Sequence, residues 1–265
     1  MSDGLVLYEV HARVATITLN RPDAMNALTL ALGEQLSEAL AEADRDPGVS
    51  CAVLTGAGEA FCAGDDVKEA WEPAALAAGL APLQRVIPAT TPETTRILQF
   101  EKPLLAAVNG IAVGVGLDLA LLADIRYAGP GALFGALYVN FNLMSDFACL
   151  RRLPQLIGPS RTAEMLFTGE VIDAAEADRI GLVSKVVDDV LGETTDLAAR
   201  IASKPPEALR YLKAGLAKGT QMTPADLAGL GEFVARGLIH LFGTQDHAEA
   251  VQAFKERRAP GFTGR

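Results

Sequence analysis

Two short apolar segments, each running into a glycine-bearing turn, constrain the fold of this chain more than any other feature. The first covers residues 51–55 and ends at Gly56 and Gly58, and the second covers residues 104–108 and is followed by glycines at 110, 114 and 116. Uninterrupted apolar runs of this length between turn residues are typical of strands buried inside a sheet. The sequence therefore predicts an α/β protein built around a buried sheet.

Hydrophobic periodicity predicts the other elements. Residues 5–10 and 13–19 alternate as the two strands of a hairpin, and residues 28–45 carry leucines at helical spacing. Extended segments are expected over 125–128, 133–134 and 183–187, and helices over 115–123, 161–167, 174–180, 194–203, 206–217, 224–241 and 246–257. We therefore expect an α/β core of residues 1–195 and a C-terminal helical region of residues 196–265.

Charge and hydropathy exclude several classes of partner. The 265-residue chain has a formal net charge of −10, so it lacks the positive charge with which proteins bind nucleic acids and anionic membranes. The stretch closest to a membrane span, residues 104–123, is interrupted by Asn109 and Asp118. We expect a protein with no nucleic-acid partner and no membrane partner.

The cysteines indicate a reducing compartment. Cys51, Cys62 and Cys149 cannot all pair, and they form no Cys-x-x-Cys motif. Such a set predicts neither a disulfide framework nor a metal site. The N-terminal residues show no basic segment followed by an apolar run, so no secretory signal is visible. Both observations favour a cytoplasmic protein.

The turn after the second apolar segment resembles a nucleotide-binding loop only in part. Residues 112–118 place two glycines between a strand and a helix, but the third glycine of a dinucleotide fingerprint would fall at Leu119. What remains is a helix N-terminus, whose backbone N–H groups stabilise negative charge. A second glycine-rich turn covers residues 56–65, so the two turns could meet at one oxygen atom. Alternatively, the glycines only allow the helix to pack closely on a strand.

Three longer segments carry a resemblance: residues 19–28 (Leu-Asn-Arg-Pro-Asp-Ala-Met-Asn-Ala-Leu), 60–69 (Ala-Phe-Cys-Ala-Gly-Asp-Asp-Val-Lys-Glu) and 102–118 (Lys-Pro-Leu-Leu-Ala-Ala-Val-Asn-Gly-Ile-Ala-Val-Gly-Val-Gly-Leu-Asp). Shorter segments between residues 167 and 262 carry the same resemblance. Together they resemble the crotonase family, the enoyl-CoA hydratases and isomerases, over nearly the whole chain. The resemblance implies a crotonase-like spiral of repeated strand–strand–helix units, with a C-terminal helical region that packs subunits into homotrimers or homohexamers.

The resemblance also implies a shared chemical device. Members of the family bind an acyl-CoA thioester and hold its carbonyl oxygen with two backbone N–H groups, which stabilises an enolate. Carried over residue by residue, the donors are Asp65, which follows Gly64, and Val115, which follows Gly114. Asp65 stands where the family more often has alanine, and Val115 where glycine is common. No permanently bound cofactor is implied, because coenzyme A arrives as part of the substrate.

The residues expected to move protons depart from the family pattern. Hydratases of the family use two glutamates, whereas this chain has Asp118 at the first position and Tyr138, 20 residues on, at the second. Tyrosine is a poor base at its usual pKa near 10, so the two-glutamate mechanism is not available. Asp146 matches a position at which dienoyl-CoA isomerases and a dehalogenating branch carry a catalytic aspartate. The three candidate catalytic residues favour isomerisation over simple hydration, although Asp118 could be only a charge near a helix N-terminus and Asp146 only a helix cap.

The resemblance places coenzyme A along these turns. The residues expected to contact it are Ala24, Met25, Ala60, Ala63, Gly64 and Gly114, with Lys68 and Arg257 as positive partners for its phosphates. Members of the family often carry lysines there, whereas the turn here presents Asp23 and Glu59. Asp66 is expected to bond local backbone groups. Residues 71–92, which contain four prolines, are expected to form a cover.

The leading interpretation is an acyl-CoA enzyme of the enoyl-CoA hydratase/isomerase type that acts on a 2- or 3-enoyl-CoA. Two alternatives stay open. The acidic Asp23 and Glu59 motivate a carbon–carbon bond hydrolase of a diketone that does not use coenzyme A, and Tyr138 motivates a protein that binds acyl-CoA without catalysis. Tight acetyl-CoA binding would exclude the first, and turnover that disappears with a single acid mutation would exclude the second.

Overall fold

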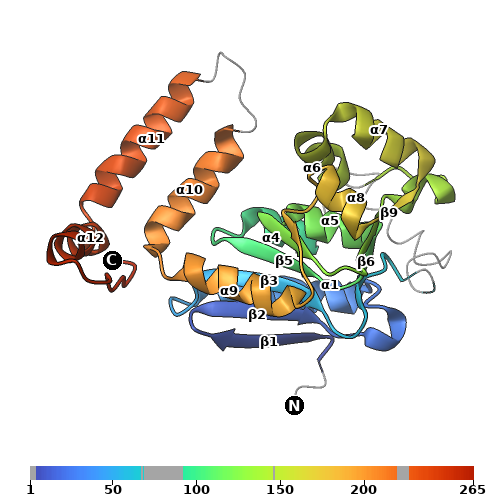
Figure 1. Ribbon diagram of the computed structural model, residues 1–265, viewed down its shortest axis with the longest axis horizontal. Helices are drawn as coiled ribbons and strands as arrows, with labels where there is room; N and C mark the ends of the chain where they lie inside the picture. Colours follow the sequence, from blue (N-terminus) through green and yellow to red (C-terminus); the bar gives the residue numbers. More distant parts are fainter. Residues whose placement is uncertain (1–3, 67, 69–91, 146, 220–226) are drawn as a thin grey trace.

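The computed structural model describes residues 4–66, 68, 92–145, 147–219 and 227–265, and Figure 1 shows their arrangement. Within these residues, one six-stranded sheet has the order β1-β2-β3-β5-β7-β10. Its strands are β1 (Val6–His11), β2 (Val14–Leu19), β3 (Cys51–Gly56), β5 (Leu104–Val108), β7 (Ile125–Ala128) and β10 (Lys185–Val186). The predicted hairpin is confirmed, because β1 and β2 pair in antiparallel fashion.

The other strands of this sheet run parallel, from β2 through β3, β5 and β7 to β10. Their carboxyl ends therefore meet at one edge. Every residue of β3 and β5 is buried, as expected for central strands that are covered on both faces. Both glycine turns follow these two strands, so both begin at the same edge of the sheet.

A second sheet holds those turns in place. Its four described strands have the order β4-β6-β8-β9 and are β4 (Ala60–Cys62), β6 (Ile111–Val113), β8 (Leu133–Gly135) and β9 (Val171–Asp173). Each of β4, β6 and β8 directly follows a strand of the first sheet along the chain. Helices α4 (Pro92–Gln99) and α5 (Val115–Leu122) complete two strand–strand–helix units, which confirms the spiral that the resemblance implies.

The other α-helices of the described residues lie on or beside the two sheets. They are α1 (Leu30–Arg45), α6 (Phe147–Ile157), α7 (Pro159–Thr168), α8 (Ala174–Arg179), α9 (Val190–Ala202), α10 (Pro206–Gly219), α11 (Leu227–Phe242) and α12 (Gln245–Glu256). In α1 the Thr29 hydroxyl caps the first turn by accepting the N–H of Leu32 at 3.1 Å. The predicted cover over residues 71–92 lies outside the described residues, except for Pro92 at the start of α4.

The C-terminal end of α5 is held by a buried arginine. Arg126 is 4% exposed, and its guanidinium donates to the carbonyl oxygens of Ala123 at 2.5 Å and Leu182 at 3.0 Å. Burial lowers the pKa of Arg126 to about 10. A cation at a helix C-terminus interacts favourably with the helix dipole, so this arginine fixes α5 from the end opposite to its glycine turn.

Helices α10 and α11 lie side by side at the left of the sheets in Figure 1, and α12 lies beyond them. Helix α9, by contrast, packs directly on the first sheet through Val190, Ala198 and Ala202. The expected boundary between residues 195 and 196 falls inside α9. The division into a core and a helical region stays a prediction.

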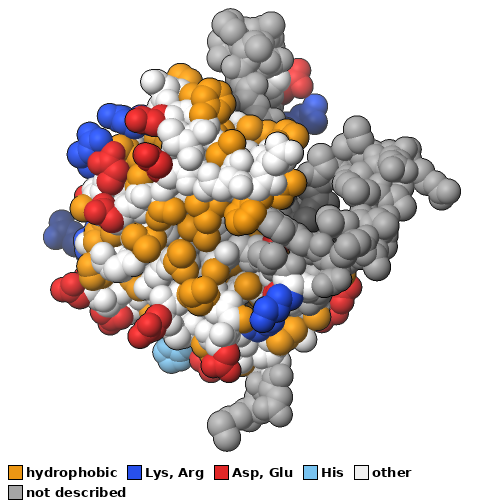
Figure 2. All heavy atoms as spheres, turned by 90° about the vertical axis from the view of Figure 1, so that its right-hand side faces the viewer, with side chains coloured by type: hydrophobic (Ala, Val, Ile, Leu, Met, Phe, Trp, Pro, Cys, Tyr) orange, Lys and Arg blue, Asp and Glu red, His pale blue; other side chains and the backbone are white. Residues whose placement is uncertain are grey.

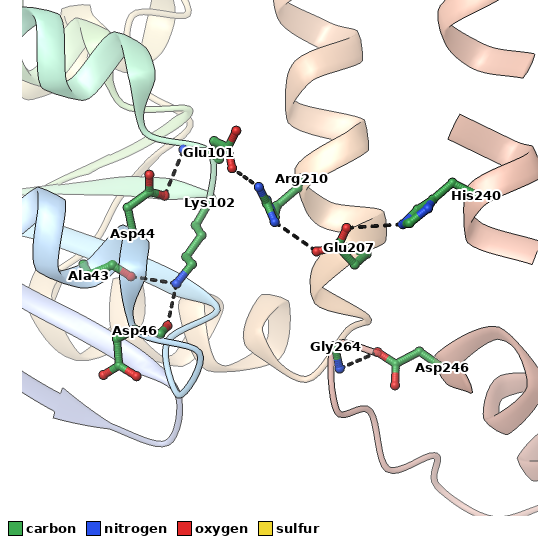
Figure 3. A network of polar contacts seen from close by, with 10 residues as sticks. All are labelled: Ala43, Asp44, Asp46, Glu101, Lys102, Glu207, Arg210, His240, Asp246 and Gly264. Atoms are coloured by element: carbon green, nitrogen blue, oxygen red, sulfur yellow. Dashed lines mark hydrogen bonds and ion pairs between the residues drawn. The ribbon is translucent and has the colours of Figure 1, made fainter. Parts of the chain in front are cut away.

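Polar contacts attach α10 to the sheet layer (Figure 3). Arg210 pairs with Glu101 and, at 3.0 Å, with Glu207. Beside this network, Lys102 donates to the carbonyl oxygens of Ala43 and Asp46, at 2.7 Å each, and so caps the C-terminal end of α1. No helix of the described residues is both long and apolar enough to cross a membrane.

Candidate active site

The two glycine turns touch. Gly64 has a φ of +96° and Gly114 a φ of +54°, which are backbone conformations that favour glycine. A Cβ atom on Gly64 would lie 3.2 Å from the carbonyl oxygen of Val113, and one on Gly114 would lie 3.7 Å from the Cα of Gly64. The residues that follow these glycines, Asp65 and Val115, are therefore brought to the same place from two different strand–turn units.

Val115 begins helix α5. The helix ladder starts with the N–H of Asp118 donating to the carbonyl oxygen of Gly114 at 3.2 Å, so the N–H of Val115 has no carbonyl partner within the helix. The N–H of Gly114 itself donates to Gly135 at the end of β8 at 3.0 Å. The turn is thus anchored to the second sheet, and the N–H groups of the first turn of α5 are available for other acceptors.

Close packing of α5 also requires a glycine at position 116, directly after Val115. A Cβ atom on Gly116 would lie 2.0 Å from the carbonyl oxygen of Cys62, so α5 rests directly on the backbone of β4. The alternative considered for residues 112–118, that glycines allow a helix to pack on a strand, is correct for this glycine. Gly116 therefore serves helix packing, while Gly64 and Gly114 bring the two turns together.

Segment 25–28 forms the other wall of the first turn. The N–H of Leu28 donates to Gly64 at 2.8 Å, and the carbonyl oxygen of Leu28 accepts the N–H of Asp66 at 2.8 Å. The N–H of Ala63 donates to the carbonyl oxygen of Met25 at 3.0 Å. These bonds place Met25, whose side chain is exposed, beside the turn that carries Asp65.

Asp118 and Tyr138 form a side-chain pair. Asp118 lies one turn into α5 and is 1% exposed, whereas the half-buried Tyr138 lies in the 3-10 helix η2 (Leu137–Phe141). The Tyr138 hydroxyl donates to Oδ2 of Asp118, and Oδ1 of Asp118 accepts the N–H of Cys149 at 2.7 Å. The structure therefore brings together two of the three candidate catalytic residues. The third, Asp146, lies outside the described residues.

Comparison with known proteins identifies the family. The sequence model of the enoyl-CoA hydratase/isomerase family matches residues 9–265. The chain belongs to that family. It is 38% identical over 261 residues to the crotonyl-CoA hydratase of Syntrophomonas wolfei, covering 97% of both proteins. It is also 38% identical to the 2,3-dehydroadipyl-CoA hydratase of Escherichia coli K12, covering 96% of both.

Solved structures agree on the fold. The enoyl-CoA hydratase of Mycobacterium tuberculosis H37Rv matches with a TM-score of 0.87 at 33% identity, covering 99% of this chain and 100% of that one. The enoyl-CoA hydratase subunit I of Geobacillus kaustophilus HTA426 matches with a TM-score of 0.87 at 35% identity, covering 98% of each chain. The chain is thus a crotonase-fold enzyme of the enoyl-CoA hydratase/isomerase type.

Two asparagines that sequence reasoning missed hold the first turn of this hydratase/isomerase. The buried Asn26 donates to the carbonyl oxygens of Ala57 and Ala60, at 2.9 and 2.7 Å. Asn109 donates to Gly58 at 2.9 Å and accepts the N–H of Gly56 at 3.2 Å. Both asparagines lie in turns, where such side chains commonly bond backbone groups, but the sequence does not indicate that they share one target.

Charged side chains surround the exposed side of the first glycine turn. Asp66 pairs with Arg21 at 2.9 Å and accepts the N–H of Lys68 at 3.1 Å, which confirms that it bonds a local backbone group. Asp65 and Lys68 are exposed, as are Asp23 and Glu59. Acidic side chains and Lys68 are thus both exposed around this turn.

Arg257 lies elsewhere in this hydratase/isomerase. It follows α12, at the left of Figure 1, whereas β6, which leads into Gly114, lies at the right. The structure does not bring Arg257 to the glycine turns within one chain. Its expected contact with coenzyme A stays a prediction.

Cys62 lies directly behind the first glycine turn. Cys62 ends β4 and is fully buried, with its sulfur 3.9 Å from the carbonyl oxygen of Gly64. Burial raises the pKa of this thiol to about 12, so it is protonated near neutral pH. All three cysteines are buried and free.

Proposed function

We propose that this enzyme binds an acyl-CoA thioester with its carbonyl oxygen between the backbone N–H groups of Asp65 and Val115. The observation that carries the proposal is the contact between the Gly64 and Gly114 turns, which each present one of these residues. Two fixed N–H donors stabilise the negative charge that develops on the oxygen when an enolate forms. Losing one such donor costs about 2.7–4 kcal/mol of transition-state stabilisation.

The proposed reaction is the hydration of a 2-enoyl-CoA. The similar proteins from S. wolfei and E. coli are named as hydratases of crotonyl-CoA and 2,3-dehydroadipyl-CoA. Asp118 and Tyr138 are the proposed proton-moving groups, and their hydrogen bond supports a joint role. Asp146 remains a third candidate, and it would favour isomerisation of a 3-enoyl-CoA as the alternative outcome.

Coenzyme A is proposed to lie along the wall formed by segment 25–28 and the first turn. The residues proposed to contact it are Ala24, Met25, Ala60, Ala63, Gly64 and Gly114. The backbone pairing of Met25 with Ala63 supports this path. Lys68 lies at the exposed end of the turn and is proposed to approach the phosphates. Coenzyme A is carried as part of the substrate, and no permanent cofactor is proposed.

A homotrimer or homohexamer is the proposed assembly. Figure 2 shows apolar side chains spread over the face that carries α6 and α7. Exposed apolar residues on this face and its neighbouring turns are Val139, Phe141, Leu143, Met144, Leu150 and Phe167. Helix α10 has no buried residue, and Leu212 and Leu216 are exposed on it. Clusters of exposed apolar side chains often mark contacts between proteins, and in this assembly Arg257 of one copy is proposed to approach the turn of another. The buried free cysteines support a cytoplasmic location.

A substrate panel tests the proposed function. Purified enzyme is supplied with crotonyl-CoA, a 3-enoyl-CoA and a 2,4-dienoyl-CoA, and the products are identified by mass spectrometry and NMR. We expect a 3-hydroxyacyl-CoA from crotonyl-CoA. Conversion of the 3-enoyl-CoA without addition of water would instead identify an isomerase. Absence of turnover on every member of the panel would refute the proposal.

A further inference from the structure

The Asp118 carboxylate lies behind the Tyr138 hydroxyl, away from solvent. Asp118 is 1% exposed, and each of its carboxylate oxygens accepts a hydrogen bond, Oδ2 from Tyr138 and Oδ1 from the N–H of Cys149 at 2.7 Å. Cys149 lies in the first turn of α6, so the carboxylate also lies at a helix N-terminus, where negative charge is stabilised. Tyr138 is half-buried. Of the two residues, Tyr138 is the more exposed.

The pair lies close to the proposed thioester site. Asp118 is three residues after Val115 in α5, a rise of about 4.5 Å along the helix axis. Tyr138 is three residues after Gly135, whose carbonyl oxygen accepts the N–H of Gly114 at 3.0 Å. The backbone of Asp118 is thus bonded directly to Gly114, and Tyr138 lies three residues beyond a second residue that is bonded to Gly114.

We propose that Tyr138 is the catalytic residue that exchanges a proton with the reacting water and substrate, and that Asp118 is a positioning residue that accepts the proton of the tyrosine. This inference rests on the proposed hydration. An isolated tyrosine hydroxyl is a poor base near neutral pH. A tyrosine that passes its own proton to a carboxylate while it takes one from water never becomes a free phenolate, which removes this difficulty.

Tyr138 and Asp118 together account for every proton that moves in the hydration. The oxygen of water forms a bond to C3 of the enoyl-CoA as one water proton moves to the Tyr138 oxygen and the tyrosine proton moves to Oδ2 of Asp118. The electron pair of the double bond moves to the thioester oxygen, which gives an enolate held by the N–H groups of Asp65 and Val115. The proton then returns from Asp118 through Tyr138 to C2. The product is a 3-hydroxyacyl-CoA, and both side chains regain their starting states.

A purely structural role predicts different behaviour. In that case Asp118 would only join α5 to α6 through Cys149, and Tyr138 would only fill space against the core. Removing the tyrosine hydroxyl would then change stability and leave kcat intact. The two roles are separated by kinetics of conservative variants rather than by loss of the fold.

The test compares Tyr138→Phe, Asp118→Asn and the double variant on crotonyl-CoA. We expect each single variant to lower kcat by about 10²–10⁴-fold, the usual contribution of a general acid–base group, with little change in KM. The single amide oxygen of asparagine can accept from the tyrosine hydroxyl or from the N–H of Cys149 but not from both, and it cannot take the tyrosine proton. Because the residues act in one chain of transfer, the double variant should be no slower than the slower single variant. The matched control is Tyr127→Phe, which removes a hydroxyl from a half-buried tyrosine of β7 and should keep wild-type kcat.

A second measurement counts the moving protons. The wild-type rate in mixtures of H₂O and D₂O should depend non-linearly on the deuterium fraction, because two exchangeable protons move together, and the residual rate of Tyr138→Phe should lose this curvature. Wild-type kcat in Tyr138→Phe, or multiplicative losses in the double variant, would overturn the relay while leaving the hydratase assignment standing. Absence of wild-type turnover would refute the proposed function and the relay together.

Discussion

Replacing Gly114 with alanine should disturb the thioester-binding turn without a steric clash. Gly114 has a φ of 54° and a ψ of −127°, a conformation that residues with a Cβ atom rarely adopt. The added Cβ would lie 3.7 Å from the Cα of Gly64, which is an ordinary contact. The substitution therefore acts through backbone strain of about 1–3 kcal/mol. Relieving that strain requires rotation about the backbone next to the N–H of Val115.

Two magnitudes follow from this geometry. Displacing one of two oxyanion donors lowers kcat by about 10²–10³-fold, and strain of this size lowers the melting temperature by about 2–4 °C per kcal/mol in a protein of this length. The assay is the hydration of crotonyl-CoA, followed by the ultraviolet absorbance of the conjugated thioester. Thermal unfolding of the same preparation measures the loss of stability.

Gly158→Ala is the matched control. Gly158 also has a positive φ, of +80°, and lies at the start of α7 with no atom within 4 Å of an added Cβ. This variant should lose stability to a similar extent and keep wild-type kcat. The reasoning is refuted if Gly114→Ala retains wild-type kcat, or if Gly158→Ala loses kcat as strongly.

Two further predictions concern titratable groups. Burial raises the pKa of the Cys51 and Cys62 thiols to about 12, so about one thiol in 10⁴ is ionised at pH 8. Iodoacetamide should therefore label them only after denaturation, and rapid labelling of the folded enzyme, detected by mass spectrometry, would contradict this. Hydrogen bonds from Arg258 and from the N–H of Gly261 lower the pKa of Glu249 from 4.5 to about 2. Since the folded state has the lower pKa, this stabilisation is complete above about pH 4.5 and disappears as the pH falls through 2. Hydrogen-exchange protection of residues 258–265 should fall over that range in the wild type and show no such titration in Glu249→Gln, and a pH-independent wild type would speak against it.

Local sequence patterns predicted the long elements. Strands β3 and β5 are uninterrupted apolar runs, and α1 has leucines at helical spacing, so each carries a complete signal within its own length. Strands β4 and β6 were missed because they lie inside segments whose glycines predict turns. Strand β9 was missed because its three residues show too little alternation and lie between two predicted helices.

The sequence predicted which residues form the candidate site but not which of them contact one another. The glycine turns and the residues after them were found from the sequence, and the structure places Gly64 against Gly114. The sequence did not predict that Asn26 and Asn109 both bond the backbone of the first turn. Each asparagine bonds a backbone group more than 30 residues away along the chain. Nothing in a local pattern identifies such a partner.

The sequence by itself determined the class of fold, the two glycine turns that could hold an oxyanion, the family resemblance and the absence of a second glutamate at position 138. These properties depend on residue type, spacing and short-range backbone preference. Only the tertiary structure decided that Tyr138 and Asp118, which come from η2 and α5, share a hydrogen bond, and that the N–H of Cys149 holds the same carboxylate. It also placed Arg257 away from the turns of its own chain. Such pairings depend on how helices and sheets pack in three dimensions, because a polar side chain finds its partner wherever packing brings a donor and an acceptor within hydrogen-bond distance.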